Sequence, residues 1–132
     1  MRGRRIIPFI IGVITLPLVA AVAADWSKAE KVTVVTAEYA FKPASLTFKQ
    51  GVAYDLHLEN QGKETHEFTA PDFFKAIEMR NPDVTGPDHV EIVLQPGDKK
   101  DLFFVATQPG LYGLICSDHD WAGMVGGITI SP

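Results

Sequence analysis

The chain has few cysteines and few basic residues, the residue types that form disulfide bonds and bind nucleic acid. It has 132 residues and one cysteine, Cys116, so an internal disulfide bond is excluded. Basic residues are scarce, because 12 lysines and arginines stand against 16 aspartates and glutamates. Nucleic-acid binding calls for a basic surface, so this balance argues against it. No repeat, low-complexity segment or change in composition marks a second domain.

The one long apolar run is at the N-terminus. Residues 1–5 are cationic, residues 6–20 are almost entirely apolar, and small residues follow up to Ala24. This order is typical of a signal peptide, so we expect residues 1–24 to be a signal peptide and residues 25–132 to form one exported, periplasmic domain. An uncleaved membrane anchor is the alternative, since residues 6–24 are close to spanning length. Without the leader, nine basic and sixteen acidic residues remain, a net charge of −7.

Short β-strand patterns fill the remaining chain. Apolar and polar residues alternate or β-branched residues cluster in seven segments: 32–36, 45–49, 52–59, 90–94, 102–105, 111–115 and 125–130. Pro96-Gly97 and Pro109-Gly110 mark turns between strands. These signals predict an all-β protein, an antiparallel sandwich or barrel. The one stretch with a helical pattern is 72–80, about two turns before Asn81-Pro82.

Cys116, His119 and Met124 lie within nine residues of one another. Each residue alone has an ordinary interpretation: a buried thiol, a surface histidine and a core methionine. Together they are a thiolate, an imidazole and a thioether in one loop at the end of a predicted strand. Two histidines and a cysteine with a weak axial methionine form an electron-transfer copper site. The loop therefore predicts three of four ligands to one copper ion.

The fourth ligand must be a second histidine, and three remain. His57 lies on the outward face of an alternating strand, where we expect it to be solvated. His89 lies in an irregular connection and could be near any part of the fold. His66 follows a glycine-containing loop and precedes Phe68, so it sits at a strand end. Because metal ligands need rigid support, His66 is preferred over His89.

At this point the sequence resembles a known family. Residues 116–130, with the spacing Cys-x2-His-x4-Met before an alternating strand, are similar to the copper loop and last strand of plastocyanins and pseudoazurins. Residues 60–66 resemble the loop that carries the first histidine of these cupredoxins. The resemblance implies a Greek-key β-sandwich of about eight strands with one short helix, and His66, Cys116, His119 and Met124 as ligands of one type 1 copper ion.

Two positions depart from the family pattern. The residue after the first histidine is usually asparagine, and here it is Glu67. The residue before the second histidine is often proline, and here it is Asp118. Both lie beside ligands, so they bear on the hydrogen bonds around the metal and on its reduction potential.

These features predict a function. We expect a carrier that shuttles single electrons between redox partners such as a c-type cytochrome, an oxidase or a reductase, and not an enzyme, because no general base or nucleophile pair is evident. Membrane association is expected only if the N-terminal segment stays attached. A periplasmic copper-delivery protein is the alternative function. Trp121 is expected either to rim the exposed edge of His119 or to pack in the core.

Overall fold

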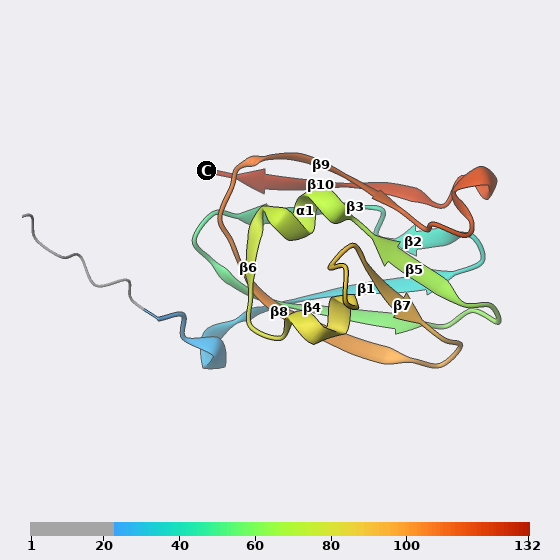
Figure 1. Ribbon diagram of the computed structural model, residues 1–132, viewed down its shortest axis with the longest axis horizontal. Helices are drawn as coiled ribbons and strands as arrows, with labels where there is room; N and C mark the ends of the chain where they lie inside the picture. The colour runs from blue at the N-terminus through green and yellow to red at the C-terminus, as the bar shows by residue number, and fades with distance from the viewer. Residues whose placement is uncertain (1–22) are drawn as a thin grey trace, which may run out of the picture.

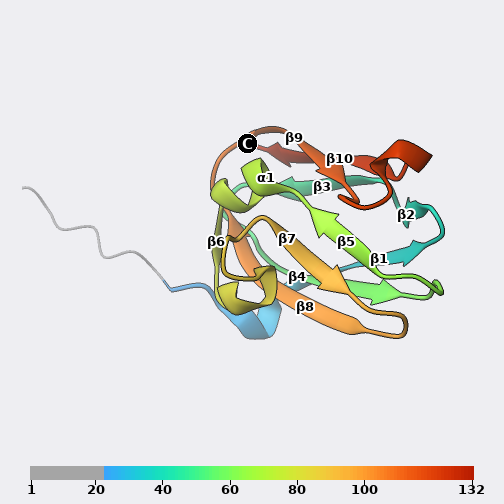
Figure 2. The same ribbon diagram turned by 45° about the vertical axis from the view of Figure 1, so that its right-hand side comes forward.

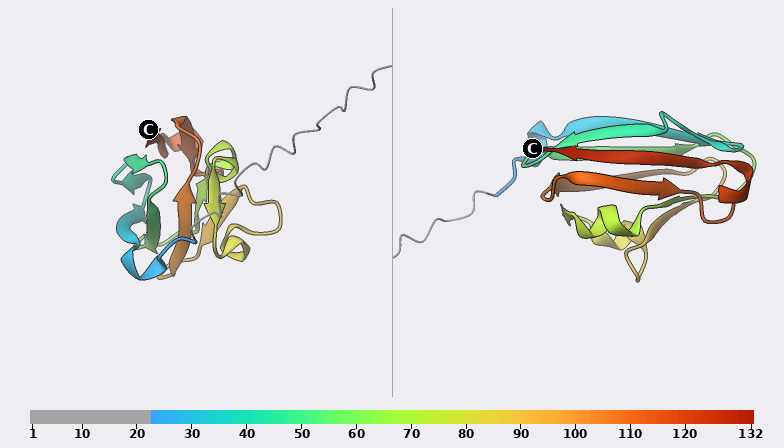
Figure 3. Two further views of the ribbon diagram at one scale, coloured as in Figure 1. Left: turned by 90° about the vertical axis from the view of Figure 1, so that its left-hand side faces the viewer. Right: turned by 90° about the horizontal axis from the view of Figure 1, so that it is seen from above.

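A computed structural model describes residues 23–132; nearly all of the predicted signal peptide, residues 1–24, lies outside the described residues. The described part is a sandwich of two five-stranded sheets, and the long strands run along the long axis (Figures 1 and 3). The first sheet has the order β2-β1-β4-β8-β6 and the second β3-β10-β9-β5-β7. The all-β sandwich is confirmed, with ten strands where the family resemblance implies about eight.

The strands of the first sheet are β1 (Glu30–Ala37), β2 (Ala40–Lys42), β4 (Ala53–Asn60), β6 (Ile77–Met79) and β8 (Lys99–Ala106). Those of the second are β3 (Ser45–Lys49), β5 (His66–Thr69), β7 (Glu91–Leu94), β9 (Gly110–Ile115) and β10 (Val125–Ser131). All seven strand segments expected from the sequence are present. The additional strands β2, β5 and β6 have only three or four residues, too few for a clear alternating pattern.

Two features differ from the sequence-based expectation. The pairs β1–β4 and β3–β10 are parallel, so the sandwich is not purely antiparallel. The helix is also shorter than predicted: α1 spans Pro71–Lys75 and the chain then enters β6, which pairs with β8. The chain at Ile77–Met79 gains an edge position on the first sheet, and this tertiary pairing overrides the weak local helix propensity.

The core lies between the sheets. In β4 every second residue is buried, so Tyr54, Leu56 and Leu58 face inward as the sequence pattern predicts. The rings of Phe48, Phe73 and Phe104 pack within 5.0–5.7 Å of one another, centroid to centroid. Because α1 contributes Phe73 and contacts both β6 and β9, it closes one open side of the sandwich (Figure 2). The helix thereby links the two sheets into the frame of the sandwich.

The two ends of the sandwich differ. The C-terminus and the first described helical turn, η1 (Trp26–Lys28), lie at one end, and the turn η3 (Asp120–Ala122) lies at the other (Figures 1 and 3). A further turn, η2 (Pro82–Thr85), precedes β7. None of the helices in residues 23–132 has the length and apolar character needed to cross a lipid bilayer.

Candidate metal centre

Three of the predicted ligands meet at the η3 end of the sandwich. His66 opens β5, Cys116 follows β9 directly, and His119 lies in the loop beyond it. One donor atom from each of these side chains lies within 4.8 Å of the other two. The Nδ1 atoms of His119 and His66 lie 3.4 Å and 4.0 Å from the sulfur of Cys116. Residues separated by fifty positions in the chain thus present a sulfur and two nitrogens to one point.

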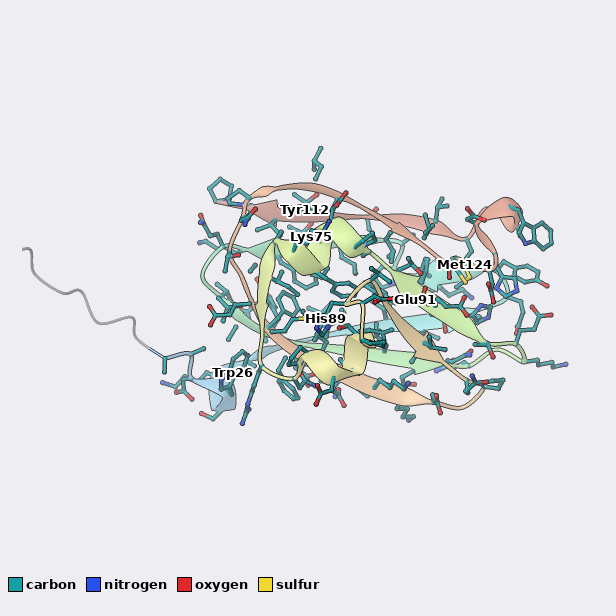
Figure 4. The ribbon with its side chains drawn as sticks, in the orientation of Figure 1. Trp26, Lys75, His89, Glu91, Tyr112 and Met124 are labelled. Atoms are coloured by element: carbon teal, nitrogen blue, oxygen red, sulfur yellow. The ribbon has the colours of Figure 1, made fainter. Side chains whose placement is uncertain are left out.

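Backbone hydrogen bonds define the loop between β9 and β10. The amide of Cys116 donates to the Met124 carbonyl over 3.0 Å, and the amide of Met124 donates to the His119 carbonyl over 3.3 Å. Gly123 has a φ of 82° at the end of η3, a conformation that glycine adopts without strain. These bonds hold the backbone of Met124 beside those of Cys116 and His119. Figure 4 shows it buried at this end of the sandwich, far from Trp26.

His119 is held from two further directions. Its Nε2 lies 3.0 Å from a carboxylate oxygen of Glu64, in the loop before β5. Donation of Nε2–H to Glu64 leaves the lone pair on Nδ1, the nitrogen that faces the sulfur. The ring of Tyr39, from the turn between β1 and β2, packs over the imidazole at a centroid distance of 4.8 Å. The ring of His119 is therefore oriented by contacts on its edge and on its face.

His66 is fully buried. Burial, together with the nearby imidazole of His119, lowers the pKa of His66, which favours the neutral ring with a free lone pair. Its Nε2 has no hydrogen-bond partner among residues 23–132, since the nearest carboxylate oxygen, on Glu38, is 3.8 Å away. That carboxylate instead accepts the backbone N–H groups of Lys63 and Glu64, which lowers the pKa of Glu38 and ties two loops together.

The thiol of Cys116 is surrounded by acceptors. Burial is the main cause that raises its pKa, so without a metal the sulfur keeps its proton. That single proton faces a Glu67 carboxylate oxygen at 3.1 Å as well as the two imidazole nitrogens. One proton cannot serve three acceptors, whereas a cation in contact with the thiolate can. The donor set of sulfur and neutral imidazole fits copper, which prefers soft ligands.

Comparison with known proteins agrees with this geometry. The sequence profile of the cupredoxin-like domain matches residues 9–130. The chain belongs to the cupredoxin-like family. No curated protein matches the chain.

Solved structures of other proteins share the fold. Auracyanin B is 23% identical with a TM-score of 0.58, covering 79% of this chain and 90% of that protein. The dithionite-reduced auracyanin of Roseiflexus castenholzii is 18% identical with a TM-score of 0.58, covering 83% of this chain and all of that protein. A multicopper oxidase from Campylobacter jejuni is 15% identical with a TM-score of 0.59, and the match spans 89% of this chain but only 32% of the oxidase.

The remaining histidines of this cupredoxin lie outside the cluster. His89 bonds Thr85 over 2.7 Å, away from the Met124 end in Figure 4. His57 faces outward as expected but is not solvated: its side chain is only 12% exposed and lies between Asp101 and Glu59, at 2.6 and 2.9 Å. Glu59 on β4 and Asp101 on β8 cover the ring. The sequence pattern of one strand does not reveal the residues that a neighbouring strand contributes.

Trp121 lies at the surface and not in the core. It is 77% exposed, and its indole N–H donates to the Asp118 carbonyl over 2.9 Å. Tyr39 lies beside it at a centroid distance of 6.1 Å. The aromatic rim of the site therefore has two members. Trp121 could be identified from its place in the predicted copper loop. No local sequence pattern marks Tyr39, Glu38 or Glu64, because the pairing of β1 with β2 and β4 brings them to the site.

Proposed function

We propose that this cupredoxin carries single electrons between redox proteins, with one copper ion held by His66, Cys116, His119 and Met124. The observation that carries the proposal is the convergence of two imidazole nitrogens on the one thiol, within 4.8 Å, at one end of the sandwich. Bound copper would supply a one-electron couple between its +1 and +2 states. Cys116 follows one strand and His66 begins another, so the frame resists rearrangement of the ligands when the charge at the site changes.

The same contacts define where partners would dock. His119 is the only one of the three clustered donors with partial exposure, at 14% of its side chain. Trp121 and Tyr39 provide apolar surface beside it, and the carboxylate of Glu64 borders it. A second carboxylate, of Glu38, lies 3.8 Å from His66. An aromatic patch with an acidic border suits a partner with a basic docking face, such as a c-type cytochrome, an oxidase or a reductase. Export to the periplasm, from the predicted signal peptide, completes the proposal.

The experiment is electrochemical. Protein loaded with one equivalent of copper should give a reversible one-electron wave and keep its metal against a mild chelator. Rapid loss of copper to the chelator, with no reversible wave, would contradict electron transfer and favour the alternative function, delivery of copper.

A further inference from the structure

Glu67 lies where the resemblance to plastocyanins and pseudoazurins leads one to expect asparagine. It is the second residue of β5, directly after the ligand His66, and it is only 5% exposed. One carboxylate oxygen lies 3.1 Å from the sulfur of Cys116, closer than either imidazole nitrogen. The backbone N–H of Glu67 also donates to that sulfur over 3.4 Å. Both ends of this residue therefore face the thiol.

Among residues 23–132, the thiol of Cys116 is the only group that donates a hydrogen bond to this carboxylate. No lysine or arginine among residues 23–132 forms an ion pair with Glu67. A buried carboxylate needs a donor or a cation, because a desolvated charge that has neither is unfavourable. The hydrogen bond from Cys116 therefore stabilises the buried carboxylate of Glu67.

Metal binding removes that hydrogen bond, because cysteine binds metals as the thiolate. With the proton gone, a carboxylate oxygen and a thiolate 3.1 Å apart would repel each other. A cation in the place of the proton removes the repulsion and serves as counter-ion to both groups. The structure thus places a carboxylate oxygen against the sulfur, beside the cluster of one sulfur and two nitrogens and not as a member of it.

We propose that the Glu67 carboxylate, held against the Cys116 sulfur, sets the balance between the two oxidation states of the copper centre. The proposal rests on the proposed function, since it assigns a further residue to the same site. An anionic group beside the thiolate stabilises the +2 ion more than the +1 ion, because the attraction grows with the charge of the ion. The centre therefore holds Cu(II) more tightly, and its reduction potential is lower, than a site with the family's usual asparagine at this position.

The test compares wild-type protein with Glu67→Gln, which keeps the shape and removes the charge. Affinities for Cu(I) and Cu(II) are measured by competition with chelators of each ion, and the reduction potential by voltammetry. We expect Glu67→Gln to weaken Cu(II) binding about 10–100-fold, with Cu(I) binding much less affected. Each tenfold loss of Cu(II) affinity relative to Cu(I) affinity raises the potential by about 59 mV. Glu67→Asn, with a shorter amide, should change both quantities in the same direction.

Glu91→Gln is the matched control. The Glu91 carboxylate is also near the loop, but it accepts hydrogen bonds from Thr69 and Ser117, not from Cys116. Melting of the metal-free variants separates an effect on copper from an effect on folding. Suppose that wild type gives a reversible wave, and that the ratio of Cu(II) to Cu(I) affinity changes no more in Glu67→Gln than in Glu91→Gln. The proposed role of Glu67 is then wrong, and the proposed function stands. A wild-type protein without such a wave overturns both.

Discussion

At the level of single residues, the site combines predictable and unpredictable parts. Cys116, His119 and Met124 could be proposed from one short segment, because a loop with their spacing has few other uses. His66 required a choice among three histidines, and the structure brings it alone to the other two donors. The Glu64 and Tyr39 contacts to His119 could not be proposed, since they depend on how distant loops meet.

Met124 is predicted to tune the reduction potential as a weak axial ligand. Met124→Leu removes a donor that slightly favours the oxidised ion, so the potential should rise. Met124→Gln supplies a harder oxygen donor, so the potential should fall. Voltammetry of the two variants checks the prediction. Unchanged potentials in both would mean that this fully buried side chain serves only the core.

At the level of elements, the long strands were predictable and their partners were not. The alternation in β4 predicts its buried face, but no local pattern reveals that β4 pairs with β1 in parallel. Pairing is decided by contacts between segments far apart in sequence. The same limit explains α1, whose expected second turn becomes the edge strand β6.

Gly126 is predicted to be required where β10 leaves the ligand loop. A Cβ at this position would overlap the backbone carbonyl oxygen of Ala44, which cannot easily move. We therefore expect Gly126→Ala to lower the free energy of unfolding by about 1–3 kcal/mol. Gly127→Ala is the control, because a Cβ there meets no atom within 4 Å. Chemical denaturation of the two metal-free variants gives the comparison, and equal stabilities would refute the steric argument.

The pairing of β4 with β8 should make stability depend on pH. The hydrogen bond to Asp101, with support from Glu59, raises the pKa of His57 although burial opposes the shift. Protonated His57 is then favoured in the folded state, so its contribution is complete below the unfolded pKa of about 6.5. The contribution is lost as pH rises through the folded-state pKa. Asp55, beside Asp101 and Lys31, also lies on this face.

Replacement of His57 by glutamine tests this pH dependence. The difference in free energy of unfolding between wild type and His57→Gln should be largest near pH 5.5 and shrink toward pH 8.5, each value set about one to two units from the ordinary histidine pKa. Denaturation curves across this range give the measurement. A difference that stays constant or grows with pH would show that the charge of His57 contributes nothing.

At the level of the whole molecule, charge and fold suit a protein that meets partners by diffusion. A net charge of −7 on residues 25–132 favours encounter with a cationic partner. The sandwich itself says less about function, because the same fold also forms part of a multicopper oxidase. The functional proposal therefore depends on the ligand cluster and its exposed rim, and not on the architecture.

Electron exchange with a basic cytochrome should slow as ionic strength rises. Attraction between exposed charges is screened over roughly 8 Å at physiological salt, so steering weakens as salt is added. Trp121→Ala should slow the exchange further without altering the copper spectrum, since the exposed indole lies on the proposed docking face. Stopped-flow kinetics over a salt series measure both effects. A flat salt dependence would remove the steering argument, and an unaltered variant rate would remove the indole from the docking face.

The absorption spectrum of the copper-loaded protein tests the central claim most directly. Cys116 is the only thiol in the chain, so a thiolate-to-copper band can arise only there. We predict an intense visible band in wild-type protein and its complete loss in Cys116→Ser, with the β-sheet circular dichroism of the variant unchanged. A wild-type protein that binds copper without such a band, or a Cys116→Ser variant that keeps it, would contradict the account.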